Sequence, residues 1–213
     1  MNDKHVPADT IDTPESMEMA AIEFQSPGRF AVHNPEPVTP EARQWDAAPF
    51  ILGQHERLER FSQPPEACAH VLALMQQAQR SLCLYSDDLE PWLYNHGSVQ
   101  QACSRFLLAS PRARLRILLR DTSRAVKEGH RLLALSRRLS SNLHIRKLNP
   151  DYPSLEQSYL IADDSGLLLR PELDQHAGYA VYADPARVRQ HRTQFDQAWD
   201  TSITDPDLRS FLL

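Results

Sequence analysis

From residue 64 onward, helical and extended patterns alternate along the chain, and this alternation is the feature that most constrains the fold. Short apolar runs between turn residues predict strands, and longer runs with apolar residues three or four apart predict helices. Two strands that are joined through a helix usually pair in parallel, because the crossover returns the chain to the same end of the sheet. The predicted strands are 82–85, 114–119, 143–148, 159–162, 167–170 and 179–182.

The helices and the last strands complete the prediction. Asp163-Asp164-Ser165-Gly166 stands between two apolar runs and is typical of a β-hairpin turn, so the later strands are expected to be antiparallel. The predicted fold class is therefore α/β, a mixed sheet flanked by helices. The predicted helices are 64–79, 98–110, 122–140 and 185–199.

Residues 1–46 differ in composition from the rest of the chain. They contain nine acidic residues, three basic residues and six prolines, and no long apolar face. Such a segment cannot bury enough apolar surface to offset the entropy of ordering it. We therefore expect residues 1–46 to form a disordered acidic tail, with a short hairpin or docking peptide around 20–33 as an alternative, and residues 47–213 to form the α/β domain.

The basic residues are concentrated in one part of an acidic chain. Residues 112–147 contain eleven Arg or Lys and two acids, although the net charge of the whole chain is -5. A local excess of this size indicates a surface that faces an anion, or an acidic partner inside the protein. If 124–140 is one helix, four of these cations recur on one side of it, flanked by His130 and Arg137. The four are Arg124, Lys127, Arg131 and Arg138.

The residue types in this block favour a phosphate-bearing ligand, because guanidinium groups bind phosphate oxygens in pairs. We expect a nucleic acid or a similar polyanion. A scaffold that docks an acidic protein partner is the alternative, and neutralisation by the chain's own acids is a third explanation. A pI of about 6.0 and the lack of interleaved aromatic residues weigh against nucleic acid. The predicted ligand-binding residues are Arg124, Lys127, His130, Arg131, Arg137, Arg138 and Arg146.

The order of elements over about 64–200, with a hairpin after the third crossover, resembles one half of the phospholipase-D-like fold. Catalytic members of that family carry His-x-Lys-x4-Asp near this hairpin, with the His as nucleophile. If Asp164 takes the Asp position of the motif, Gln157 and Tyr159 stand at the His and Lys positions. If Asp163 takes it, Glu156 and Ser158 stand there. Because neither alignment supplies the nucleophile, the resemblance implies the fold without phosphodiesterase chemistry. It leaves open whether two copies pair as a homodimer.

A closer resemblance rests on 129–141, together with Leu84-Tyr85-Ser86 and Ala162-Asp163-Asp164-Ser165-Gly166. These segments are similar to a family of small proteobacterial proteins that has no assigned activity. In relatives, this domain sometimes follows a GNAT-type acetyltransferase. The present chain has six glycines and no glycine-rich pyrophosphate loop after a strand, so no acetyltransferase is expected in it.

Other kinds of chemistry have little support in the sequence. The three cysteines have no C-x-x-C spacing, which favours a reduced, cytoplasmic protein. No His pair has the spacing of a metal motif, so we expect neither metal nor cofactor. No run approaches 18 apolar residues, so no membrane span is predicted. Asp87-Asp88 and Asp163-Asp164 follow strands and are expected to shape turns, although an unfamiliar enzyme that uses them with His130 is a further alternative.

Overall fold

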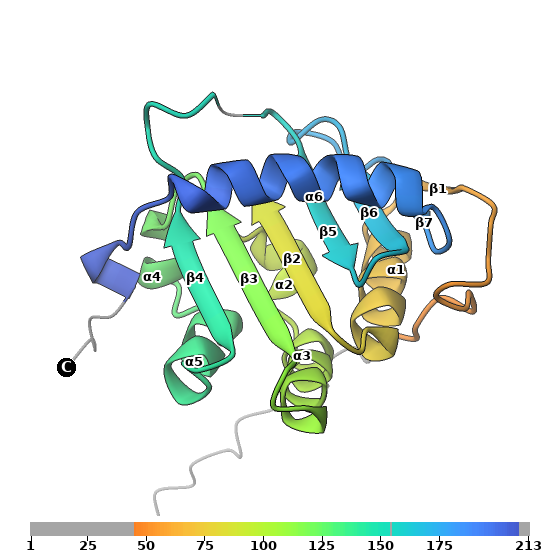
Figure 1. The fold of residues 1–213 in the computed structure, drawn as a ribbon, viewed down its shortest axis with the longest axis horizontal. Helices are drawn as coiled ribbons and strands as arrows, with labels where there is room; N and C mark the ends of the chain where they lie inside the picture. The colour runs from red at the N-terminus through yellow and green to blue at the C-terminus, as the bar shows by residue number, and fades with distance from the viewer. Residues whose placement is uncertain (1–44, 154, 209–213) are drawn as a thin grey trace, which may run out of the picture. The chain divides into compact units, whose positions relative to one another are not determined.

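A computed structural model describes residues 45–153 and 155–208, and within them seven strands form one mixed sheet (Figure 1). The strand order is β1-β7-β6-β5-β2-β3-β4. Strands β2, β3 and β4 are parallel, and every other neighbouring pair is antiparallel. The strands are β1 Glu59–Phe61, β2 Ser81–Ser86, β3 Arg114–Leu119, β4 Leu143–Lys147, β5 Ser158–Ala162, β6 Gly166–Arg170 and β7 Gly178–Val181.

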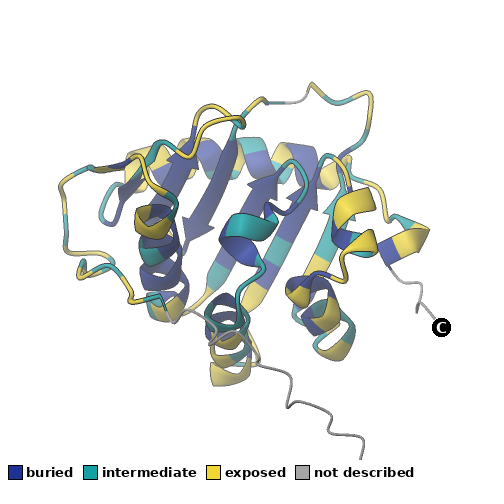
Figure 2. Ribbon diagram, turned by 180° about the vertical axis from the view of Figure 1, so that it is seen from behind, coloured by how far each residue is buried: buried dark blue, intermediate teal, exposed yellow. Residues whose placement is uncertain are grey.

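Helices cover both faces of the sheet. The long helix α6 crosses one face, and α1, α2, α3 and α5 lie over the other, as Figures 1 and 2 show from opposite sides. Pro64 and Pro185 each stand in the first turn of a helix, where the missing N–H costs nothing. The helices are α1 Pro64–Gln77, α2 Pro91–Tyr94, α3 Gly97–Ala109, α4 Ser123–Lys127, α5 Arg131–Arg138, α6 Pro185–Asp200 and the 3-10 helix η1 Pro206–Leu208.

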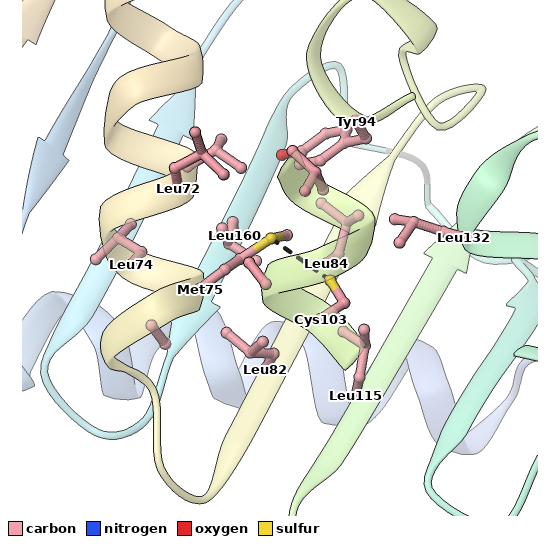
Figure 3. Close-up of a cluster of buried hydrophobic side chains, with 14 of the residues drawn as sticks. Leu72, Leu74, Met75, Leu82, Leu84, Tyr94, Cys103, Leu115, Leu132 and Leu160 are labelled. Atoms are coloured by element: carbon pink, nitrogen blue, oxygen red, sulfur yellow. Dashed lines mark hydrogen bonds between the residues drawn. The ribbon is translucent and has the colours of Figure 1, made fainter. Parts of the chain in front are cut away.

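Strand β2 lies inside the sheet between β5 and β3, and apolar side chains cover both of its faces. Leu84 packs toward α1 and α3, whereas Tyr85 packs toward α6. Figure 3 shows the larger core, where the Sγ atom of Cys103 lies 3.6 Å from the Sδ atom of Met75. The three cysteines are free and buried, and burial raises the pKa of Cys103 to about 12. These thiols therefore act as small apolar side chains.

The predicted α/β class and mixed sheet are confirmed, and the six predicted strands lie within one or two residues of their observed positions. The sequence did not predict β1 or the short helix α2. In the segment before α1, Phe61 is buried in one core cluster and Leu58 packs against the other, whereas Ile51 is 54% exposed.

The predicted helix 122–140 is wrong, because the structure divides it into α4 and α5. Gly129 has φ +61, a left-handed conformation that ends α4 and that glycine adopts without strain. The chain then turns, and His130 begins α5 as its N-cap residue. The four cations therefore do not form one continuous helical stripe.

The N-terminal prediction falls largely outside the described residues, which begin at Trp45. From Trp45 onward, the chain packs against the domain and forms hydrogen bonds with it. Trp45 Nε1 donates to His96 Nδ1 at 3.4 Å, and the Phe50 ring stacks on His70 with centroids 5.6 Å apart. The side-chain amide of Gln77 accepts from Leu52 N–H and donates to the Phe50 carbonyl, both at 2.8 Å.

These contacts lead to a test of the domain boundary. Removal of residues 1–44 should leave the cooperative thermal transition within a few degrees of the full chain, because it spares the contacts of Trp45 and Phe50. Removal of residues 1–55 should lower the midpoint by several degrees, since it strips apolar cover from α1 and removes the two hydrogen bonds of Gln77 to Leu52 and Phe50. Differential scanning calorimetry measures both. Loss of the transition in the shorter deletion would contradict the predicted boundary.

Candidate functional site

Part of the basic block is neutralised inside the domain. Arg124, a predicted ligand-binding residue, contacts Asp88 Oδ2 through Nη1 at 2.8 Å and Glu128 Oε1 through Nε at 2.9 Å. Three other cations of the block also reach acids brought close by the fold. These pairs are Arg116–Asp196 at 2.7 Å, Arg120–Asp87 at 3.3 Å and Lys147–Asp205 at 4.0 Å. Arg124 therefore has two anionic partners before any ligand binds.

His130 lies beneath the surface. Its side chain is buried, and Nδ1 accepts a hydrogen bond from Leu132 N–H at 3.1 Å, which caps the first turn of α5. Burial lowers the pKa of His130 to about 4, so the imidazole is neutral at pH 7. His130 positions α5 and presents no charge to a ligand. No sequence pattern indicates this role, because histidine is an uncommon N-cap residue.

Three of the predicted residues remain as exposed cations. Arg131 and Arg138 lie seven residues apart on the solvent side of α5, with exposed Ala134 between them, and Lys127 ends α4. Seven residues span about 10.5 Å along a helix and return to nearly the same side of it. Within the described ranges, no ion pair joins these three side chains to an acid. We call Lys127, Arg131 and Arg138 the exposed basic surface.

The remaining two predicted ligand-binding residues, Arg137 and Arg146, both line a groove of about 430 Å³ along the outer edge of β4. Arg137 comes from α5 and Arg146 from β4, so tertiary structure brings them together. The Arg146 guanidinium lies 4.7 Å from the centroid of the Trp199 ring. The groove is lined by Ser136, Arg137, Ser140, Leu143, His144, Ile145, Arg146, Thr204 and Leu208.

A buried polar cluster that the sequence did not reveal lies where β2 ends. Glu90 Oε2 accepts hydrogen bonds from Ser158 Oγ at 2.7 Å and from Ser86 Oγ at 3.3 Å. Glu90 Oε1 forms an ion pair with Arg170, which is fully buried at the end of β6. The carboxyl ends of parallel strands are where α/β proteins usually bind ligands. Here the two charges neutralise each other, so the Glu90 carboxylate is not presented to solvent as a free base.

The hairpin residues are also engaged. The Asp163 carboxylate accepts hydrogen bonds from three consecutive backbone N–H groups, those of Gln79, Arg80 and Ser81, at 2.7–2.9 Å. Tyr159 stacks on Tyr85 with ring centroids 5.2 Å apart. The expectation that Asp163 shapes a turn is thus confirmed. A larger groove of about 670 Å³ adjoins this turn, but Asp163 and Asp164 line it, which makes it a poor site for an anion.

The described residues indicate neither a membrane-spanning helix nor a metal site. In the described ranges, no helix is both long and apolar enough to cross a membrane. The same residues contain no cluster of three His, Cys, Asp or Glu side chains that could hold a metal ion.

The profile of a protein family described as "Domain of unknown function (DUF7931)" matches residues 63–211. The chain belongs to this family. The match begins at the N-cap of α1 and covers the crossover helices, the hairpin and α6. Among curated proteins, none matches the chain. Family membership therefore assigns no activity to the DUF7931 domain.

Solved structures show what the fold resembles. TrmBL2, an archaeal chromatin protein with a mode of DNA binding described as novel, matches with TM-score 0.52 and 13% identity, over 70% of this chain and 54% of TrmBL2. NucT from Helicobacter pylori matches with TM-score 0.51 and 11% identity, over 70% of this chain and 99% of NucT. Nuc from Salmonella typhimurium, a phospholipase D family member, matches with TM-score 0.47 and 14% identity, over 68% of this chain and 94% of Nuc.

These similarities concern the fold alone, and the mixed sheet flanked by helices agrees with the predicted α/β class. The DUF7931 chain spans about half of TrmBL2, so the activity of that whole protein does not transfer to it.

The buried state of His130 predicts a dependence of stability on pH. A folded pKa of about 4, below the unfolded value of 6.5, means that the full stability is present above pH 6.5 and is lost as pH falls toward 4. Between pH 7.5 and pH 5, His130 should account for about 2 kcal/mol of the decrease. His130→Asn keeps a capping acceptor and does not titrate, so urea unfolding of this variant should show a smaller decrease. Equal decreases would show that His130 is not buried as a neutral cap.

Proposed function

We propose that this DUF7931 domain is a non-catalytic module that binds a phosphate-bearing polyanion, in the first instance a nucleic acid, through its exposed basic surface. The observation that carries the proposal is the state of Lys127, Arg131 and Arg138. They are exposed and, within the described residues, form no ion pair with an acid, whereas neighbouring Arg124 is already paired with two. Cations held at an exposed helix surface attract the phosphate backbone without reading sequence.

The arrangement favours contacts to the backbone over contacts to bases. Trp199, beside Arg146, is 8% exposed, so its face is not available for stacking on a base. Proteins that bind single strands without sequence preference rely on such stacking. We therefore infer binding to a duplex through phosphates. The similar fold of TrmBL2, described as a DNA-binding chromatin protein, supports nucleic acid as the first ligand to test.

Charge reversal at α5 tests the binding surface. Arg131→Glu with Arg138→Glu should weaken binding to a labelled 20-base-pair duplex by at least about tenfold, because two phosphate contacts become repulsive. The plot of log affinity against log salt should also become shallower by about 1.8, since each phosphate neutralised contributes about 0.9. Fluorescence anisotropy over a series of salt concentrations measures both quantities.

The matched control is Arg105→Glu with Arg189→Glu, which makes the same change in net charge at exposed positions on α3 and α6. The control should reduce affinity much less. Equal losses in the two double variants would mean that only net charge matters. Failure of the unmodified protein to bind duplex at low salt would refute the proposal. Thermal unfolding should be nearly unchanged in both, because substitutions at exposed positions usually alter stability by about 0.5 kcal/mol or less.

The absence of catalysis is a separate expectation. Ser158 and Glu90 are tied to each other and to Arg170, and Tyr159 is packed against Tyr85. Purified protein should not hydrolyse bis-(p-nitrophenyl) phosphate, phosphatidylcholine or single-stranded DNA above a buffer blank. Turnover that persists through purification and disappears in Ser158→Ala would show that the buried cluster opens and is catalytic.

A further inference from the structure

Strand β4 has one edge paired with β3 and one edge that faces outward. In a parallel ladder, the backbone groups of alternate residues point to opposite neighbours. Leu115 N–H donates to the Asn142 carbonyl at 2.9 Å, and Leu148 N–H donates to the Leu119 carbonyl at 2.7 Å. This register directs the N–H and C=O groups of Leu143, Ile145 and Lys147 outward.

The outward edge is only partly used. Lys147 exchanges two backbone hydrogen bonds with Ile203, at 2.9 and 3.0 Å, as a short antiparallel bridge. The chain then turns away through Thr204 into η1, which lies beside this edge in Figure 1. Leu143 N–H bonds to the Leu139 carbonyl at 3.0 Å. Among the described residues, no backbone hydrogen bond reaches the outward N–H and C=O of Ile145. The edge therefore accepts an antiparallel partner at Lys147 and is open at the next outward position.

The groove described above follows this open edge, and cations flank it from both faces of the strand. Leu143 and Ile145 face the α5 side, where Arg137 lies. His144 and Arg146 alternate with them and therefore face the α6 side, where Arg146 contacts Trp199. None of the described residues that line the groove is acidic. The backbone offers hydrogen bonds to an extended chain, and the flanking side chains favour a negative one.

We propose that the edge of β4 is a docking site for an extended acidic peptide segment of a partner protein, which adds as a strand beside Leu143–Arg146. Addition of a strand to an exposed sheet edge is a common mode of peptide recognition, in which backbone bonds give affinity and side chains give specificity. The peptide's backbone pairs with the outward N–H and C=O of Ile145 and with the outward C=O of Leu143, whose N–H already bonds to Leu139. Its carboxylates meet Arg146 and His144 on one face or Arg137 on the other.

A peptide fits this place better than a nucleic acid does. Four strand residues span about 13 Å, and the outward N–H and C=O at Ile145 match the alternating donors and acceptors of a polypeptide. A sugar-phosphate backbone has acceptors but no amide donor for the Ile145 carbonyl. The inference goes beyond polyanion binding at α5, because it concerns different residues and a different class of partner. The two surfaces together would make the domain an adaptor between a polyanion and an acidic protein segment.

The test uses the full chain and two labelled peptides of equal charge. The first is the acetylated and amidated sequence Glu-Val-Asp-Val-Glu-Val-Asp, which can form a strand. The second replaces each Val with Pro, which removes amide donors and prevents pairing. In fluorescence anisotropy, the first peptide should bind at least about tenfold more tightly than the second, because backbone hydrogen bonds are lost in the second.

Hydrogen exchange identifies the edge itself. In the free protein, the Ile145 amide should exchange faster than those of His144 and Arg146, which face β3. A saturating concentration of the first peptide should slow exchange at the Ile145 amide by at least about tenfold. Arg137→Glu with Arg146→Glu should abolish binding of the peptide, whereas Arg131→Glu with Arg138→Glu should leave it nearly unchanged.

Several results would overturn the proposal. Equal binding of the two peptides, or binding without protection of Ile145, would mean that charge alone holds the peptide. No binding up to about 1 mM would exclude the site as a useful docking surface. Protection of Ile145 by duplex DNA, and not by the peptide, would assign the groove to nucleic acid. None of these outcomes depends on whether the exposed basic surface binds DNA, so the two proposals can fail separately.

Discussion

The ion pair between Glu90 and Arg170 is the interaction on which one end of the domain depends. Arg170 has no exposed surface and Glu90 is 5% exposed, so each charge must be balanced inside the protein. Removing one partner of a buried pair typically costs about 3–5 kcal/mol, because the other charge is left unpaired. Arg170 also donates to the carbonyls of Leu173 and Gln175, and it thereby fixes the loop between β6 and β7. Leu89 and Glu90 have φ values of 68° and 32°, an unfavourable turn that this pairing holds in place.

The same pair explains why the end of the sheet that usually carries chemistry is closed in this domain. Ser86 and Ser158 donate to Glu90 rather than to solvent, and the Trp92 ring lies 4.9 Å from the Arg170 guanidinium. In this cluster both serine hydroxyls are bound to the Glu90 carboxylate. The two interaction surfaces that we propose lie on the β4 side of the sheet, where α5 presents cations and one outward position of the strand edge has no backbone partner among the described residues.

The sequence predicted the fold better than the site, and particular residues show why. Strands such as 114–119 were found because alternating and apolar runs depend on neighbours in the sequence. The helix 122–140 was wrong because one glycine with positive φ outweighed a periodic pattern on both sides of it. The sequence pattern predicts His130 as a surface ligand because its burial depends on contacts with the rest of the domain, which the pattern does not contain. The residues around Arg124 in the sequence do not indicate its pairing with Asp88, since the two lie 36 positions apart.

By itself, the sequence determined the α/β class, the hairpin, the lack of a phospholipase D nucleophile and the concentration of basic residues. These follow from composition and from spacing over a few residues. Only the tertiary structure decided which of those cations are neutralised, because charge pairing depends on distance in space. It also decided that Glu90 and Arg170 meet, and that the outward backbone groups of Ile145 have no backbone partner among the described residues. Strand pairing and charge burial bring together residues that are far apart in the sequence, so a pattern over a few neighbouring residues does not predict these contacts.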